Sequence, residues 1–443
     1  MSVKFKGCGA KLLVYVIIAM LISFKLSSLY SEKPETSSGK KPVIWLNFFV
    51  HGIMSIKPHI SWNNFMLFLK DQVEGTLYEK TVELMREDAF FFRNQAMQKI
   101  GVCQIDPLLF DGNASASLAF VLDEIGKHYG IERNNRYYTF GWNGLLSAKS
   151  RYNEARNLFI ALENLTMQLR QQNFEPKVRL IGYSHGGNVN LNLAAVRRKE
   201  YPNSTLVVDE IVNIGTPVIS DSDYLVNDPM FKRIFHLYSM YDRVQPLDFF
   251  APKQIFSDRI FRPRKGFDLP NKLVQIQIKV TRCKSTVSQC PKRFPLSMNL
   301  KKPLIVYGKK GLLRDMSPGH VELWFFGWTP LHYRDSFPLY PLPAISFAPV
   351  ILHHAEKIAT SLSPEYSIVA DIRPQHNVIL FRPHNKHEVH STIPYIPQEK
   401  LKELHTAILQ CKPELYSDDI YNAHIQDAVR NAQEIMRKNI NLK

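Results

Sequence analysis

The sequence lacks the features that mark several large classes of protein. It contains no low-complexity tract and no repeat period, which argues against a disordered or a solenoid protein. It also contains no zinc-ligand spacing and no nucleic-acid-binding motif, and its basic residues are scattered rather than arranged in a stripe. We therefore expect a globular protein with no metal, no cofactor and no nucleic-acid partner.

Cysteine is scarce, with five residues in a chain of 443. Cys283 and Cys290 are close enough in sequence to form a disulfide across a polar loop, but spacing alone does not decide between a disulfide and free thiols. Cys8 precedes an apolar stretch and is a candidate for acylation if that stretch is retained. The disulfide state therefore stays open.

Charged residues of both signs are abundant, and the excess is positive, with a formal net charge of +16. Lys4, Lys6 and Lys11 precede a nearly uninterrupted apolar run from Leu12 to Phe24. A basic segment followed by about 13 apolar residues is typical of a secretory signal, and it is shorter than the roughly 20 residues of a membrane-spanning helix. No small-residue cleavage site stands out near Ser27 to Ser31, so a cleaved signal and a retained signal anchor both stay open. We expect a membrane-anchored or exported protein whose basic surface favours anionic lipid.

Beyond this segment, the apolar pattern predicts strands that alternate with helices. The expected strands are Val43–Val50, Tyr137–Trp142, the run ending at Ile181, Leu206–Ile214, Phe235–Met240 and Leu273–Thr281. The expected helices are Ser61–Leu69, Thr76–Lys99, Ser115–Tyr129, Arg151–Gln171, Asn188–Lys199 and Asp228–Ile234. Such alternation favours an α/β fold with a mainly parallel sheet and helices on both of its faces.

The composition divides the chain into three parts. Residues 1–40 form the signal peptide or signal anchor with a polar linker, and residues 41–330 form the α/β domain. Residues 331–443 are expected to be a C-terminal region appended to it, with a hairpin from Ser367–Asp371 and Asn377–Phe381 and helices over Gln398–Cys411 and Asp418–Lys438. The role of this region is not indicated by its sequence.

The most informative motif is Gly182-Tyr183-Ser184-His185-Gly186, which follows an apolar strand and precedes a helix. Gly-x-Ser-x-Gly in this context describes a nucleophile elbow, a sharp turn that lifts the serine hydroxyl clear of the sheet. The flanking glycines allow close backbone approach. A serine hydroxyl is a poor nucleophile at neutral pH, so Ser184 requires an imidazole to take its proton and a carboxylate to orient that imidazole. The alternative is an ordinary Gly-Ser loop.

With these residues the chain resembles the α/β-hydrolase superfamily, and in particular its lipases and serine esterases, over roughly Pro42 to Trp328. The resemblance implies the α/β-hydrolase fold and the order nucleophile, acid, histidine along the chain. Asp242, just after the strand expected to end at Met240, matches the acid. The competing carboxylates are Asp221, Asp223 and Asp248.

The histidine implied by the resemblance matches His320, in a Gly-His pair ahead of an apolar helix. The alternative for His320 is a helix-capping histidine on the surface. Weaker rivals are His332, His353 and His354.

The resemblance also implies an oxyanion hole built from two backbone N–H groups. The first belongs to His185, at the positive end of the helix that follows the serine. The second is expected from the loop His51-Gly52-Ile53-Met54, with Ile53 the first candidate donor and Met54 the next. A simple strand-terminating turn is the alternative for this loop. The long stretch before the serine, which includes Thr76 to Tyr129, departs from the commonest family pattern and is a candidate lid.

Together these features predict a serine hydrolase that cleaves a carboxylic ester through an acyl-enzyme. The apolar N-terminal segment, the basic balance and aromatic runs such as Phe90–Phe92 and Trp324–Phe326 favour a lipid-like substrate. Two alternatives stay open: an acyltransferase or thioesterase with the same triad, and a non-catalytic hydrolase-fold protein that binds a partner at the membrane. The sequence does not indicate the acyl chain, the head group or the oligomeric state.

Overall fold

The computed structural model of the protein describes residues 41–54, 71–93, 95–107, 114–246, 257–283, 313–315, 317–328, 333, 336–384, 389–410, 412 and 416–441. The chain divides into two compact units, Met1–Pro42 and Val43–Lys443, and the structure described below is that of the second. Several expectations fall outside the described residues, namely the apolar run Leu12–Phe24, the helix Ser61–Leu69, and Cys8, Cys290 and Cys411. Within the described ranges no helix is both long and apolar enough to cross a membrane.

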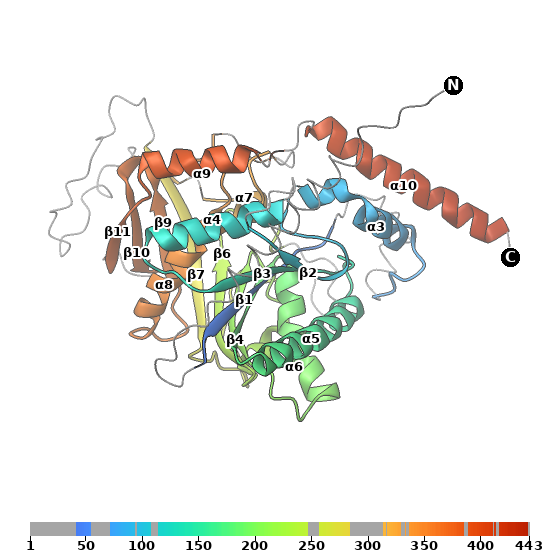
Figure 1. Cartoon of the computed structure of the whole chain (residues 1–443), viewed down its shortest axis with the longest axis horizontal. Coiled ribbons are helices and arrows are strands. Elements are labelled where there is room, and N and C mark those ends of the chain that lie inside the picture. The colour runs from blue at the N-terminus through green and yellow to red at the C-terminus, as the bar shows by residue number, and fades with distance from the viewer. Residues whose placement is uncertain are drawn as a thin grey trace, which may run out of the picture. The chain divides into compact units, whose positions relative to one another are not determined.

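One large sheet forms the centre of the second unit (Figure 1). Its strands are β1 (Val43–Val50), β2 (Gly101–Ile105), β3 (Asn135–Gly141), β4 (Glu175–Tyr183), β5 (Val208–Ile214), β6 (Phe231–Tyr238), β7 (Leu273–Cys283), β8 (Leu313–Asp315), β9 (Ile368–Arg373), β10 (Val378–Pro383) and β11 (Ser391–Pro394). Their order is β11-β10-β9-β7-β6-β5-β4-β1-β3-β2, with β8 paired to β7. The central pairs are parallel, and the antiparallel pairs lie at the two edges and at β8.

Helices cover both faces of this sheet. They are α3 (Leu77–Glu87), α4 (Ala114–His128), α5 (Ala148–Gln171), α6 (His185–Glu200), α7 (His320–Trp324), α8 (Ala348–Ala359), α9 (Gln398–Gln410) and α10 (Asp418–Asn441). Short 3₁₀ helices are η1 (Ala89–Arg93), η2 (Asp223–Asn227), η4 (Ala344–Phe347) and η5 (Pro374–His376). The predicted α/β class, with a mostly parallel sheet flanked by helices, is confirmed.

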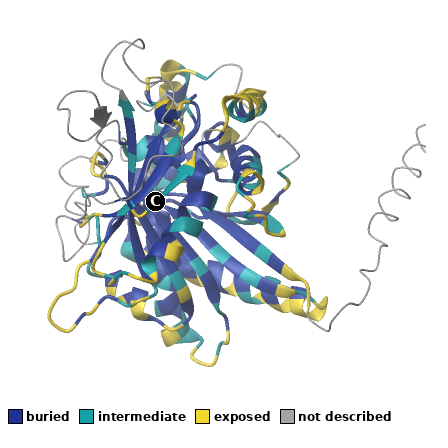
Figure 2. Ribbon diagram, turned by 90° about the vertical axis from the view of Figure 1, so that its left-hand side faces the viewer, coloured by how far each residue is buried: buried dark blue, intermediate teal, exposed yellow. Residues whose placement is uncertain are grey.

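The alternation of side chains along the strands divides the core into two layers. On β4, Val178 and Leu180 belong to the apolar cluster packed under α5 and α6. Ile181 and Tyr183 belong to the cluster on the opposite face, packed under α4 and α8. Because neighbouring side chains of a strand point to opposite faces, a strand buried on both sides is apolar at nearly every position near the centre. Figure 2 shows the strands coloured as buried through most of their length.

Two local predictions were wrong for reasons visible in the structure. The helix expected over Asp228–Ile234 is a turn followed by β6, because the Asp228 carboxylate accepts the N–H of Met230 at 3.0 Å and pairs with Arg197 at 2.8 Å. The helix expected to run to Lys99 ends at Glu87, where the N–H of Asp88 caps it. The chain then forms η1 and β2, a strand that the sequence pattern did not predict.

The sheet continues beyond residue 330. β9 pairs in parallel with β7, and β10 and β11 extend the same edge. The predicted hairpin of β9 and β10 and the predicted helices α9 and α10 are present. The boundary expected at residue 330 therefore does not divide the sheet, and the region from 331 onward lies in the same compact unit as the strands before it.

A buried ion pair in β9 offers a test of this integration. Asp371 and Arg373 are each 1 % exposed, and the Arg373 Nη2 to Asp371 Oδ2 distance is 2.7 Å. Arg373→Ala leaves a buried carboxylate unpaired, so we expect a loss of about 3 to 5 kcal/mol in the free energy of unfolding. The five tryptophans all precede residue 330, so urea unfolding followed by tryptophan fluorescence reports on the part of the chain before that residue.

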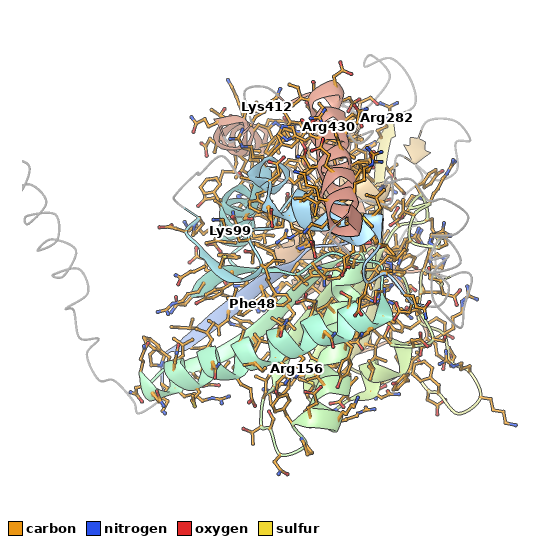
Figure 3. All side chains as sticks on the ribbon, turned by 90° about the vertical axis from the view of Figure 1, so that its right-hand side faces the viewer. Phe48, Lys99, Arg156, Arg282, Lys412 and Arg430 are labelled. Atoms are coloured by element: carbon orange, nitrogen blue, oxygen red, sulfur yellow. The ribbon has the colours of Figure 1, made fainter. Side chains whose placement is uncertain are left out.

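The matched control is Arg430→Ala on α10 (labelled in Figure 3), whose partner Asp427 is 2.8 Å away with both side chains more than half exposed. This exposed pair is expected to contribute less than about 1 kcal/mol. A tryptophan transition that Arg373→Ala does not move would show that residues 331–443 unfold independently.

Candidate active site

Ser184 lies in a sharp turn between β4 and α6. Its backbone has φ +50° and ψ −130°, a positive φ that non-glycine residues rarely adopt and that costs on the order of 1–3 kcal/mol. The N–H of Ser184 donates to the Ile214 carbonyl of β5 at 2.9 Å, and its carbonyl accepts the N–H of Gly187 at 3.0 Å. The turn is therefore held by hydrogen bonds on both sides. Ser184 itself is 6 % exposed.

Three glycines make room for this turn. A Cβ at Gly182 would lie 2.7 Å from the Cα of Gly187, and a Cβ at Gly186 would lie 2.2 Å from the Val50 carbonyl. A Cβ at Gly187 would lie 2.1 Å from the Thr216 hydroxyl oxygen. The first two glycines belong to the recognised pentapeptide. Gly187 lies outside the pentapeptide. The requirement for glycine there comes from Thr216, which follows β5 and packs against the start of α6.

The structure brings Asp242 and His320 together, although 78 positions separate them in the sequence. The His320 Nδ1 lies 2.7 Å from Asp242 Oδ2. The other carboxylate oxygen, Oδ1, accepts the N–H groups of Val244 and Gln245, both at 2.9 Å. Asp242 is fully buried, and the His320 side chain is 12 % exposed. A buried carboxylate with all of these donors is held in one orientation and fixes the imidazole it faces.

The same region of the structure brings His320 next to the turn of Ser184. A Cβ at Gly215 would lie 3.1 Å from Asp242 Oδ2 and 3.3 Å from His320 Nδ1, and the preceding residue, Ile214, accepts the N–H of Ser184 at 2.9 Å. Tyr183 contacts His320 directly, because its hydroxyl donates to the His320 carbonyl at 3.0 Å and the ring centroids are 4.8 Å apart. Tyr183 is thus in a position to orient His320, and sequence reasoning did not single it out. Its only signal was its place in the pentapeptide.

The competing residues lie in other surroundings. Asp223 forms a double hydrogen bond with the Arg264 guanidinium, one arm at 2.9 Å. His353 and His354 lie on α8, where burial lowers the pKa of His354 to about 4. Asp221 follows β5 and is not the partner of His320. The remaining two rivals, Asp248 and His332, lie outside the described residues.

The loop after β1 lies against the serine turn. A Cβ at Gly52 would be 2.9 Å from the Ser184 Cβ, so only glycine permits this approach. His51 is fully buried, and its Nε2 accepts the N–H of Trp142 at 3.3 Å while its Nδ1 donates to the Gly52 carbonyl at 2.6 Å. The Trp142 indole N–H in turn donates to the His51 carbonyl at 2.7 Å. Burial, reinforced by Arg86, holds the pKa of His51 well below its usual value, so the ring bridges the two backbone groups in its neutral form.

The two expected second oxyanion donors differ in their hydrogen bonding. The N–H of Met54 donates to the Gly144 carbonyl at 3.2 Å, so it is engaged within the loop. The N–H of Ile53 has no acceptor among the described residues. The N–H of His185 lies at the first position of α6, at the positive end of the helix. Ile53 and His185 are therefore the better pair of candidates, and Met54 serves to hold the loop.

Substituting Gly52 tests the closeness of this loop to Ser184. In Gly52→Ala the new methyl group would displace either the loop or the serine, and a displacement of about 1 Å can lower a rate about 100-fold. We expect such a fall in the rate of Ser184 acylation with little change in Tm. Gly126→Ala in α4, whose nearest contact would be 3.4 Å, is the matched control. An acylation rate equal to that of the control would contradict the arrangement.

A buried histidine supports the strand that carries the acid. His236 on β6 donates from Nε2 to the Arg259 carbonyl at 2.7 Å, and the Arg259 guanidinium donates to the Asp242 carbonyl at 2.9 and 3.1 Å. Burial lowers the pKa of His236 to about 4 from its ordinary 6.5. The neutral ring therefore holds the segment that fixes Asp242.

This lowered pKa predicts a dependence of stability on acidity. Below pH 6.5 His236 is protonated in the unfolded chain, whereas in the folded protein it stays neutral down to about pH 4. The free energy of unfolding therefore falls as the pH falls through this window. The loss amounts to about 2 kcal/mol by pH 5 and about 3 kcal/mol in all. In His236→Gln this contribution is absent, so the difference between urea unfolding at pH 7.5 and pH 5 should shrink by about 2 kcal/mol. An unchanged difference would show that His236 keeps an ordinary pKa.

Helix α10 packs beside the loop after β1. Met54 belongs to the same buried cluster as Tyr78 of α3 and Tyr421 of α10. The His424 ring of α10 stacks on Phe90 with a centroid distance of 3.9 Å, and its Nδ1 lies 2.5 Å from the Asp88 carboxylate. The stretch expected to be a lid therefore packs against residues from the far end of the chain.

Among the described residues, no group of three or more histidine, cysteine, aspartate or glutamate side chains could hold a metal ion. Comparison with known proteins adds nothing to the assignment of the site. No family model matches the chain, and searches of curated proteins and of solved structures find no match. The candidate active site therefore depends on the geometry of its own residues.

Proposed function

We propose that this protein is a serine hydrolase with the α/β-hydrolase fold, which cleaves a carboxylic ester of lipid-like character through an acyl-enzyme. One observation carries the proposal: the buried Asp242 carboxylate holds His320 at 2.7 Å beside a serine in a strained turn between a strand and a helix. The topology adds support. Along the chain, β1 is followed first by β2 and β3 on one side of it and then by β4 and β5 on the other, and sites in α/β sheets form where successive strands diverge in this way.

The proposed reaction assigns one task to each group. His320 uses Nδ1 to contact Asp242, which leaves Nε2 to take the proton of the Ser184 hydroxyl as its oxygen attacks the acyl carbonyl. The N–H groups of His185 and Ile53 stabilise the oxyanion. The tetrahedral intermediate collapses, the carbon–oxygen bond to the alcohol breaks, and His320 returns the proton to the departing alkoxide. Water then repeats the sequence on the acyl-enzyme and releases the acid.

The substrate class rests on the aromatic and apolar character of the surroundings. Tyr183 stacks on Trp324 at a centroid distance of 5.2 Å and contacts Phe325 edge-on at 5.7 Å, so an apolar layer lies directly behind the serine turn. Membrane association is part of the proposal and rests on the Leu12–Phe24 run and the net positive charge. Extraction of cell membranes with high salt and then with detergent tests it: protein released without either treatment would contradict the association.

The enzymatic proposal is tested with a fluorophosphonate probe and a panel of p-nitrophenyl esters of rising chain length. We expect covalent labelling of the wild-type protein and turnover that rises with acyl length. Labelling without ester turnover, but with transfer of the acyl group to an added alcohol or thiol, would replace the hydrolase by an acyltransferase. The absence of labelling in folded protein would indicate a non-catalytic binding protein instead.

A further inference from the structure

A row of polar and charged side chains crosses the central strands on the face under α4 and α8. The strand pairing aligns Tyr137, Asn47, Arg179, Glu210 and Arg233 at one level of β3, β1, β4, β5 and β6. An interior sheet face covered by helices is normally apolar. On this face the halves of the strands nearer Ser184 follow that rule, but the halves nearer the amino ends do not.

The row lies in a cavity of about 800 Å³ between α4, α8 and the sheet. In Figure 1, α4 and α8 lie on the same side of the sheet, and both contribute lining residues. Arg179 precedes Ser184 by five residues on β4, which corresponds to roughly 16 Å at the rise of a strand. The cavity is therefore separate from the candidate active site.

The lining carries an excess of positive charge, with seven lysine and arginine residues against five aspartate and glutamate residues. Its centre shows how the excess arises. Glu210 is shared by two guanidinium groups, that of Arg133 at 3.0 Å and that of Arg179 at 2.6 Å. Both guanidinium groups also lie over the Trp45 ring, at 4.1 and 4.9 Å from its centroid. The two cations are therefore held close together, although the single Glu210 carboxylate balances the charge of only one of them.

The titration of nearby groups reflects this positive field. Burial and the neighbouring Arg179 lower the pKa of Arg133. On α8, burial, Lys357 and Arg133 together lower the pKa of His353. A bound anion would relieve the repulsion among these groups, and a planar guanidinium is well suited to bind the oxygens of a phosphate in pairs.

We propose that this cavity binds a phosphate-bearing anion, with Arg133 and Lys357 as its recognition residues and Arg179 and Trp45 as the platform that holds Arg133. Its volume is sufficient for a small phosphate ester. The phosphate could be a free metabolite or the head group of a lipid. The proposal does not depend on the chemistry of Ser184.

The test is thermal unfolding of the full-length protein titrated with inorganic pyrophosphate, with sodium chloride adjusted to keep ionic strength constant. We expect a saturable rise in Tm. Arg133→Gln should weaken the apparent affinity at least about 10-fold, as for the loss of a charge-assisted hydrogen bond. Lys357→Gln, an exposed substitution chosen to preserve the fold, should weaken it several-fold.

Arg156→Gln is the matched control, because Arg156 also pairs with a glutamate, Glu200 at 2.5 Å, but lies on α5 (Figure 3), none of whose residues lines the cavity. Arg156→Gln should leave the pyrophosphate affinity unchanged. A rise in Tm that is equal in Arg133→Gln and in the wild type would overturn the proposal, and so would a Tm that does not respond together with no Arg133-dependent binding to the vesicles described next.

Vesicles distinguish the two sources of phosphate. If the ligand is a lipid head group, full-length protein should bind phosphatidylcholine vesicles more tightly when they contain phosphatidic acid, and Arg133→Gln should remove only that increment. If the ligand is soluble, pyrophosphate should still bind while phosphatidic acid adds no Arg133-dependent increment. Either result supports the site, whereas the absence of both effects overturns it.

Discussion

Ser184→Ala is expected to abolish covalent labelling by a fluorophosphonate and to lower ester hydrolysis by about 10⁴-fold or more, because no other group in the proposed mechanism forms the acyl bond. The fold should persist. The alanine removes a single oxygen, and the hydrogen bonds that hold the turn come from the backbone of residue 184 and not from its side chain. Mass spectrometry of the labelled wild-type protein should place the phosphonate on the peptide that contains Gly182 to Gly187.

A matched control for this variant is Ser222→Ala. Ser222 is also buried and donates to the Asn188 carboxamide oxygen at 2.6 Å, so its loss perturbs the start of α6 without removing the proposed nucleophile. Labelling of Ser222→Ala should continue. Undiminished labelling of Ser184→Ala would show that the nucleophile lies elsewhere in the chain.

Asp242→Asn and His320→Ala are each expected to slow acylation of Ser184 by about 10⁴-fold. An asparagine at position 242 would retain the size of the side chain but could present an N–H to His320 Nδ1, which favours the wrong tautomer. His320→Ala removes the proton acceptor itself. Stopped-flow measurement of p-nitrophenol release under single-turnover conditions isolates the acylation step.

The double variant gives a sharper test of cooperation between the two residues. If Asp242 acts only through His320, the double variant should be hardly slower than His320→Ala alone. Asp223→Asn is the control carboxylate: it loses its pairing with Arg264, and so some stability, but should keep its acylation rate within about 10-fold. A rate as low as that of Asp242→Asn would make the assignment of the acid wrong.

Much of the site could be predicted because its signals are local. The pentapeptide around Ser184 and the position of Asp242 at the end of a strand can each be read within about ten residues, and the alternation of strands and helices supplies the common edge at which they meet. The structure places Asp242 and His320 in contact, and their catalytic roles stay a prediction. What local patterns could not supply is the set of groups that hold them.

The holding groups depend on the register between distant strands. Trp142 and Gly144 fix the loop after β1, yet their own segment contains no motif. The row of charged side chains in the cavity also depends on the register between strands. Arg179, Glu210 and Arg233 lie in strands whose carboxyl-terminal halves are mostly apolar, and only the pairing of the strands shows that the three side chains lie side by side. The pairing of β9 with β7 depends on the same kind of long-range contact, so it too escaped prediction.

The packing of α10 against α3 has a consequence for the synthesis of the protein. The ribosome releases β4, Ser184 and the loop after β1 long before it releases α10, whose Tyr421 joins the cluster behind Met54. Until then the aromatic side chains of η1 lack part of their packing, and contacts distant in sequence form slowly. The nascent chain should therefore carry an exposed apolar surface beside an already formed serine turn, and a chaperone that binds such surfaces would find its substrate there.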